Sequence, residues 1–220
     1  MTLEETREAL LQAALPHVLF DGWTEATLRA AARDVDLTPE AAINAFPEGP
    51  RDLVEAFSHW ADEEMLRGLA ARDLEEMRMR DRIATGVRLR LEALAPHREA
   101  LRRSLSFLAL PPNAPLATRL LWRTADVLWY AAGDKATDYN YYSKRLLLAG
   151  VVSATTLYWL EDNSEDFTDT WGFLERRIDE VLKIGGRFGR TMSSLLDLPD
   201  RLFHRRSLLD RPPPRRFGAR

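Results

Sequence analysis

The 220-residue chain contains no cysteine, which excludes disulfides, thiolate metal sites and cysteine nucleophiles. It has only four histidines, which are scattered along the sequence: His17, His59, His97 and His204. Glu55 and His59 can share a helix face, but no second carboxylate–histidine pair accompanies them to support a di-iron site. A glycine-rich phosphate loop and a GxSxG sequence are also absent. We therefore expect a protein that is not an enzyme and holds no metal ion.

The chain also lacks an apolar run of the roughly 18–20 residues that a transmembrane helix needs. Its first residues, MTLEETREALLQ, are acidic and have the features of neither a signal peptide nor a transit peptide. We expect a soluble protein, or one that meets a membrane only through its C-terminal tail.

Helical periodicity is present almost throughout, and with 45% apolar residues the chain can bury a sizeable core. We therefore expect an all-α fold without a sheet. Thr24 and Thr38 have the chemistry of helix N-caps, and Pro39 suits a first helical position. The expected helices span residues 3–15, 24–34, 39–45, 50–71, 74–94, 97–109, 114–131, 137–160, 165–184 and 187–206.

The C-terminal segment differs from the rest in charge and pattern. Residues 1–60 carry 4 Lys and Arg against 11 Asp and Glu, residues 61–182 carry 17 against 20, and residues 183–220 carry 10 against 3. Beyond the two glycines at 185 and 186, helical spacing places an apolar arc opposite a polar face, which is typical of a helix lying on a membrane. The candidate membrane-binding residues are Arg187, Phe188, Arg190, Met192, Leu195, Leu196, Arg201, Leu202 and Phe203.

A last helix that folds back on its own core is the alternative for this segment. Adjacent Gly185 and Gly186 favour a flexible break instead, because glycine weakens a helix and permits a change of direction. We expect a hinge there, a kink or split at Pro199, and disorder after residue 206.

The first sixty residues have the order and spacing of a helix-turn-helix. In GWTEATLRAAARDVDLTPEAAINAFPEGPRDLVEAF, two short helices and a Phe-Pro turn precede a long helix, and this cadence resembles the TetR-type DNA-binding domain. The recognition helix expected at Thr38 to Phe46 contains Glu40 and no Lys or Arg. Because phosphate neutralisation supplies most non-specific DNA affinity, we expect a degenerate helix-turn-helix kept as a scaffold.

The stretch from Asp126 to Ile184 is the most distinctive part of the sequence. Its segments WYAAGD, TDYNYYSKR and DTWGFLERRI, with ALPHVLFDGWTEATLRAAA near the start, resemble the ubiquinone-biosynthesis accessory family Coq-nine over about residues 5–206. The resemblance implies a TetR-like bundle that has gained a lipid pocket and an extra C-terminal amphipathic helix that touches the membrane. It also implies that the protein brings an isoprenoid quinone precursor to a di-iron demethoxyubiquinone hydroxylase. With no transit peptide, we expect a bacterial protein in the cytoplasm, peripheral on the inner membrane.

One aromatic stripe is a candidate partner surface. Trp122, Asp126, Trp129, Tyr130 and Gly133 recur at intervals of three and four. The pattern fits contact with a partner, and it also fits core packing with Asp126 paired to a neighbouring arginine. The resemblance matches this region to the surface that contacts the hydroxylase, so it assigns that role to Asp126, Trp129 and Tyr130 and leaves Trp122 in the core.

The segment from Tyr139 to Leu160 is apolar around more of its circumference than one packed face needs. By pattern alone it fits a central helix buried on several sides, and the same residue types would line a lipid cavity. With the resemblance, we expect a cavity enclosed by this helix and by helices 97–109 and 114–131. The expected lining residues are Phe107, Leu108, Leu120, Leu121, Leu128, Leu148 and Val152.

These expectations divide the chain into a helix-turn-helix subdomain (1–50), a lipid-binding and dimerisation body (51–184), a membrane-binding helix (185–206) and a disordered tail (207–220). We expect a homodimer, by analogy with TetR-like folds. The expected ligand is an isoprenoid quinone precursor or a phospholipid, without any other cofactor and without nucleic acid. The alternative function is a TetR-type transcriptional regulator with a hydrophobic ligand pocket.

Overall fold

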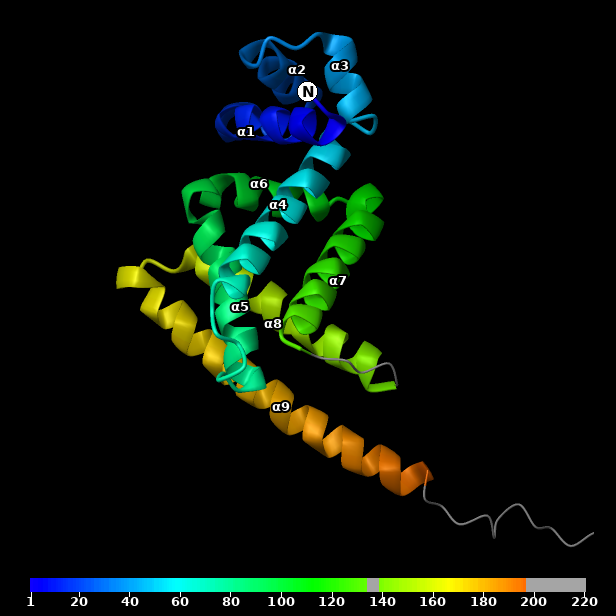
Figure 1. The fold of residues 1–220 in the computed structure, drawn as a ribbon, viewed down its shortest axis with the longest axis vertical. Helices are drawn as coiled ribbons and strands as arrows, with labels where there is room; N and C mark the ends of the chain where they lie inside the picture. The colour runs from blue at the N-terminus through cyan, green and yellow to red at the C-terminus, as the bar shows by residue number, and fades with distance from the viewer. Residues whose placement is uncertain (134–138, 197–220) are drawn as a thin grey trace, which may run out of the picture. The chain divides into compact units, whose positions relative to one another are not determined.

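The computed structural model describes residues 1–133 and 139–196, with the backbone alone at 139–141, 182 and 184–196 (Figure 1). The described residues form helices and contain no strand, which confirms the all-α expectation. The helices are α1 (Leu3–Asp21), α2 (Glu25–Asp34), α3 (Pro39–Ala45), α4 (Pro50–Ala70), α5 (Met79–Leu94), α6 (Arg98–Leu108), α7 (Ala114–Ala131), α8 (Tyr139–Glu161) and α9 (Thr168–Leu196).

Helices α1, α2 and α3 gather at one end, and α4 leads from them into the remaining helices (Figure 1). The side chains of Thr24 and Thr38 accept hydrogen bonds from backbone N–H groups one turn later, as their N-cap chemistry predicts. α1 continues through Pro16 to Asp21, although we expected it to end at residue 15. It stops at Gly22, whose φ of 66° is favourable only for glycine.

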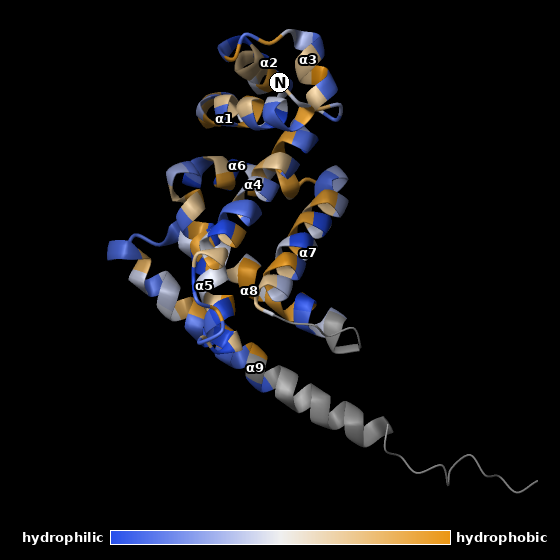
Figure 2. Cartoon of the chain, in the orientation of Figure 1, coloured by the Kyte–Doolittle hydropathy of each residue, from blue (hydrophilic) through white to orange (hydrophobic). Residues whose placement is uncertain are grey.

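Helices α4 to α8 form the body of the molecule, with α4 packed against α5 and α7, and α7 packed against α8. Figure 2 shows hydrophobic residues recurring along these helices between hydrophilic ones, as expected for helices that bury one face. α5 and α7 approach closely at Gly86, where an added Cβ would lie 2.3 Å from Cδ1 of Leu128. A larger residue at position 86 would therefore force the side chain of Leu128 to move.

The start of α9 is fixed by a buried carboxylate. Asp162 accepts hydrogen bonds from the backbone N–H of Ser164 at 2.7 Å, and from the N–H and hydroxyl of Thr170 at 2.9 and 2.5 Å. Burial alone would raise the pKa of Asp162, but these hydrogen bonds outweigh it and hold that pKa well below its usual value. Further along, α9 is tied to α5 by ion pairs from Arg80 to Glu175 and Asp179.

The chain divides into two units, Met1–Gly185 and Gly186–Arg220. The helical backbone of α9 nevertheless runs from Thr168 to Leu196 through both glycines. The expectation of separate helices on either side of them is wrong. Each glycine costs about 1 kcal/mol relative to alanine in a helix interior, which weakens a helix but does not end one with helix-forming neighbours on both sides.

Candidate ligand cavity

A cavity of about 320 Å³ lies among α4, α5, α6, α7 and α8. This volume falls at the lower end of the roughly 300–1,000 Å³ typical of small-molecule sites. Most of its wall is apolar. The lining side chains are Val54, Phe57, Ser58, Ala61, Arg90, Leu94, Leu101, Ser104, Leu105, Leu108, Ala109, Ala117, Leu120, Leu121, Thr124, Val152, Ser153, Thr156 and Leu157.

Helical periodicity explains how each helix supplies its part of the wall. α4 contributes Val54, Phe57, Ser58 and Ala61, which are spaced at i, i+3, i+4 and i+7 and so lie on one face. α7 contributes its own four residues at the same spacing. The cavity is therefore the place where the inward faces of several amphipathic helices fail to fill the space between them.

Four residues expected in the lining do line the cavity: Leu108, Leu120, Leu121 and Val152. Phe107, Leu128 and Leu148 do not. Phe107 is half-buried and packs against the core beside the cavity, because it is rotated about 100° around α6 from Leu108. Leu128 and Leu148 are 0% and 2% exposed and fill the solid core, with Leu128 packed over Gly86.

The cavity wall contains a buried polar cluster that we did not predict. Arg90 of α5 donates from Nε to Oδ1 of Asp62 at 2.8 Å and from Nη2 to the hydroxyl of Ser58 at 3.2 Å. The hydroxyl of Thr124 donates to the same Asp62 oxygen at 2.9 Å. Arg90 is 8% exposed and Asp62 is 1% exposed, so this is a buried ion pair.

A signal for this pair exists in the sequence. Asp62 lies on the buried face of α4, one residue after Ala61 and three before Met65, which are both fully buried. A carboxylate at a core position of an amphipathic helix is rare unless it is paired. Helical spacing alone therefore marks Asp62, but the identity of its partner on α5 depends on tertiary packing.

Two histidines adjacent to cavity residues have lowered pKa values. Burial lowers the pKa of His97, whose ring packs edge-on against Trp60 with centroids 5.3 Å apart. Burial, followed by the charge of Arg123, lowers the pKa of His59. His59 and Glu55 lie 3.7 Å apart, and the described part of the chain holds no cluster of metal-ligating side chains.

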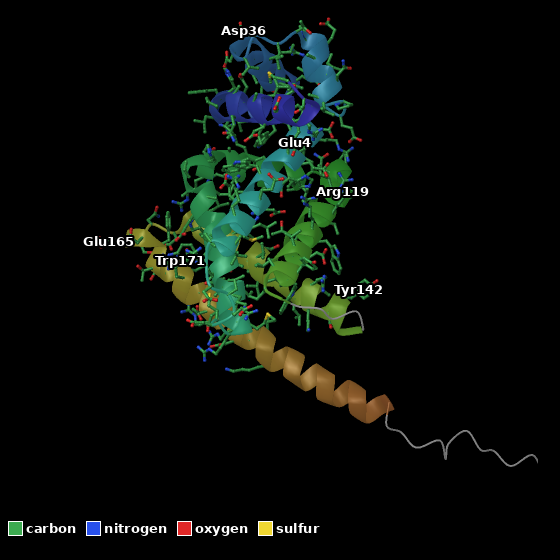
Figure 3. The ribbon with its side chains drawn as sticks, viewed as in Figure 1. Glu4, Asp36, Arg119, Tyr142, Glu165 and Trp171 are labelled. Atoms are coloured by element: carbon green, nitrogen blue, oxygen red, sulfur yellow. The ribbon has the colours of Figure 1, made fainter. Side chains whose placement is uncertain are left out.

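Other side chains join the helices around the cavity. Arg119 of α7 donates to Oε2 of Glu55 of α4 at 2.7 Å, while Arg88 of α5 lies 4.8 Å from the ring centroid of Trp171 of α9. Figure 3 labels Arg119 and Trp171, which come from different sides of the helical body. These contacts hold α4, α5, α7 and α9 together outside the apolar core.

The residues of the expected partner surface differ in their exposure. Tyr130 is 76% exposed, whereas Trp129 is 7% exposed and donates from Nε1 to the carbonyl of Lys144 at 3.0 Å. Asp126 accepts a hydrogen bond from Nε of Arg145, which matches the core-packing alternative. Trp129 is therefore not exposed on the surface of this chain, because its ring packs between α7 and α8, and its contact with a partner stays a prediction. Trp122, expected in the core, is half-buried.

The candidate membrane-binding residues fall largely outside the description. Arg187, Phe188, Arg190, Met192, Leu195 and Leu196 belong to the backbone of α9, and their side chains lie outside the described residues. The last three, Arg201, Leu202 and Phe203, lie beyond the described residues altogether. Among the helices that are described, none combines the length and the apolar content needed to cross a bilayer.

The expected recognition helix is confirmed as the short helix α3, and it carries Glu40 but no basic residue. Ile43 of this helix is 58% exposed. This helix offers no cation for DNA phosphates, and Asn44 is its only side chain that could donate a hydrogen bond to a base edge.

The fold and cavity define a helical protein of the TetR-like class with an internal apolar cavity. A TetR transcriptional regulator from Nitrosomonas europaea superposes with a TM-score of 0.66, covering 80% of this chain and 97% of that one at 20% identity. At that identity the likeness establishes the fold alone.

Sequence relationships identify the family. A sequence profile of the COQ9 family matches residues 114–185. Ubiquinone biosynthesis protein COQ9-B of Xenopus laevis is 31% identical over 198 residues, covering 87% of this chain and 67% of that protein. The mitochondrial COQ9 protein of Rattus norvegicus is 34% identical over 193 residues, covering 83% of this chain. The chain belongs to the COQ9 family.

The chain spans about 60% of the length of the rat protein and 59% of the Homo sapiens protein. Both are named mitochondrial, and this contradicts our expectation of a bacterial cytoplasmic protein. That expectation relied on the first residues of the sequence. An acidic start to a chain that matches only part of its relatives does not identify a compartment.

Proposed function

We propose that this chain acts in ubiquinone biosynthesis as a non-enzymatic lipid-binding factor, which binds an isoprenoid quinone intermediate and presents it to the demethoxyubiquinone hydroxylase. The observation that carries the proposal is the apolar cavity among α4 to α8. The relatives named as ubiquinone biosynthesis proteins supply the pathway. The quinone ring and the start of its isoprenoid tail need an apolar enclosure, and a wall built mainly of leucine, valine, alanine and phenylalanine provides one.

The cavity wall supports binding more than catalysis. Its polar side chains are Ser58, Arg90, Ser104, Thr124, Ser153 and Thr156. None is a carboxylate, imidazole or thiol, which are the usual acids, bases and nucleophiles. Arg90 donates hydrogen bonds to Asp62 and Ser58, so its positive charge is neutralised by a carboxylate of the protein itself.

For the hydroxylase surface we retain Tyr130, with Asp126 beside it one turn earlier on α7. The phenol of Tyr130 is 76% exposed and the side chain of Asp126 is 40% exposed. Exposed tyrosine beside a charge is typical of interface anchors. Trp129, which is buried between α7 and α8, fixes the position of this part of α7.

A homodimer through α8 and α9 is part of the proposal. On α8, Leu146 is 67% exposed, and an added Cβ at Gly150 would meet no atom within 4 Å. These residues lie four apart on one open face, which suits close approach of a second helix. Sedimentation equilibrium of the full chain is the measurement that decides it.

We also propose that the segment from Arg187 to Phe203 binds the membrane that supplies the ligand. Its net positive charge attracts anionic lipid, at about 1 kcal/mol per Lys or Arg near the surface, and its apolar arc adds burial. Since α9 continues through Gly185 and Gly186, the proposal does not include a hinge at these two glycines.

One vesicle experiment tests both parts of this function. The full chain is incubated with phosphatidylcholine–phosphatidylglycerol vesicles that contain a long-chain ubiquinone. Flotation then separates vesicle-bound protein from free protein. Quinone is extracted from the free protein and measured by mass spectrometry. We expect part of the full-length protein to float with the vesicles, and the part that remains free to carry bound quinone. Deletion of residues 187–220 should abolish flotation while circular dichroism shows an intact helical body.

The two readouts fail independently. Flotation of the truncated chain equal to that of the full chain would remove the membrane role of the segment. Absence of quinone from the full chain, with vesicles still bound, would remove the lipid-carrying role of the cavity.

A further inference from the structure

We infer that the ligand enters the cavity head first, with an uncharged, oxygen-bearing ring at the end formed by Arg90, Ser58 and Thr124 and its apolar tail toward the exposed end of the wall. This inference rests on the proposed lipid-binding function. It adds the polarity of the ligand, its orientation and the residues that recognise its head.

The residues of the cavity wall differ in burial. Thr124 and Arg90 are 2% and 8% exposed, next to Asp62 at 1%. Leu157 of α8 is 59% exposed and Ala109 at the end of α6 is exposed too, so the wall reaches the surface at these residues. A ligand that enters beside Leu157 passes the hydroxyl side chains that α8 contributes to the wall, and it meets the buried ion pair only when it is inserted further.

Arg90 can recognise an oxygen atom of the ligand. A guanidinium carries five N–H donors in a planar fork. Nε of Arg90 donates to Asp62, and Nη2 donates to Ser58, while Arg90 itself forms part of the cavity wall. The two contacts fix the plane of the guanidinium, so its remaining donors are pre-organised for a carbonyl or phenolic oxygen.

The charge balance selects an uncharged head. The positive charge of Arg90 is already matched by Asp62 at 2.8 Å. Arg123 lies 3.7 Å from the other oxygen of that carboxylate, but its side chain is 43% exposed and is not part of the cavity wall, so its charge is solvated. Bringing a phosphate among Leu94, Leu101 and their apolar neighbours would bury an unpaired charge at a large cost. A quinone or phenol ring needs only hydrogen bonds.

The pair itself is unexpected in a purely apolar binding site. A buried ion pair is often no more stabilising than well-packed apolar residues of the same volume, so it is weak evidence for a role in stability. At the inner end of an apolar cavity, the pair supplies the few placed polar groups that give a ligand site its orientation and selectivity.

The experiment compares two probes delivered from cyclodextrin and measured by calorimetry: a dimethoxy-methyl-benzoquinone with a decyl chain, and decylbenzene, which has a ring and chain but no oxygen. The test variant is Arg90→Met/Asp62→Leu, which removes the pair without leaving a lone charge. The control is Arg67→Met, which removes an arginine paired with Glu64 on the exposed face of α4.

We expect the double variant to bind the quinone about tenfold more weakly, as expected for one lost charge-assisted hydrogen bond, with unchanged binding of decylbenzene. The control should bind both probes as the wild type does. Equal losses for both probes, or none for the quinone, would overturn head-first binding. Failure of the wild type to bind either probe would instead count against the proposed function.

A second measurement needs no variant. In the infrared spectrum of the wild-type complex, a carbonyl that accepts a hydrogen bond from Arg90 absorbs at lower wavenumber than the same quinone in hexane. An unshifted carbonyl band in the bound quinone would show that the ring does not reach Arg90. The same outcome would favour insertion by the tail.

Discussion

Replacing Ala117 with phenylalanine is expected to weaken binding of the decyl quinone by about a hundredfold, equivalent to about 2.7 kcal/mol. Ala117 lines the cavity from α7, and its side chain is a single methyl group, so the added ring extends from the wall into the space. A cavity of about 320 Å³ cannot hold both this ring and a quinone head with the start of its tail. Calorimetric titration measures the loss.

The matched control is Thr118→Phe, which adds the same ring one residue along α7 at an exposed position. It should leave quinone affinity within about twofold of wild type, because surface substitutions away from the site change binding little. Full affinity in Ala117→Phe, with an unchanged melting temperature, would show that the ligand binds elsewhere.

Replacing Asp62 with alanine is expected to lower the free energy of unfolding by about 3–5 kcal/mol. Asp62 is 1% exposed and accepts hydrogen bonds from Arg90 and Thr124, so its removal leaves a buried guanidinium without its counter-charge. Chemical denaturation followed by circular dichroism measures the change.

Asp62→Leu combined with Arg90→Met should recover most of that stability, because replacing both charges with apolar groups removes the unpaired cation. Glu64→Ala is the control on the same helix. Glu64 pairs with Arg67, whose side chain is exposed, so loss of this ion pair should lower the free energy of unfolding by at most about 1 kcal/mol. A loss below about 1 kcal/mol in Asp62→Ala would mean that Arg90 reaches solvent or another anion.

Local signals accounted for most of the helix order. N-caps at Thr24 and Thr38, with Pro39 at the first helical position, mark helix starts that the structure keeps. The errors arise where a residue with low helix propensity lies in a helix that continues. Pro16 is inside α1, and the glycines at 185 and 186 are inside α9. Propensity is a small local free energy, and neighbouring residues override it.

The cavity was expected from the family resemblance, and helical periodicity identified part of the inward face that lines it. Leu120 and Leu121 follow from the pattern of α7, but the contribution of α4 and α5 does not follow from their own patterns. Val54 and Phe57 have the spacing of ordinary core residues. Whether a core residue meets another side chain or an empty space depends on how several helices pack, which no single helix encodes.

The aromatic stripe on α7 shows a similar limit. Asp126, Trp129 and Tyr130 share a region of the helix, yet Trp129 is buried and Tyr130 is exposed. The difference arises because α8 packs against α7, and the backbone carbonyl of Lys144 accepts a hydrogen bond from the indole of Trp129. Spacing alone did not distinguish an interface tryptophan from one that joins two helices.

The most direct test of the central claim is a crystal structure of the chain with a quinone that carries bromine at the end of its decyl tail. Bromine can be located by its anomalous scattering. The account predicts the ring within hydrogen-bond distance of Arg90 and the bromine toward Leu157, at the exposed end of the wall. Bromine beside Arg90, or a ligand bound only in the surface groove formed by Tyr158, Asn163 and Phe173, would contradict it.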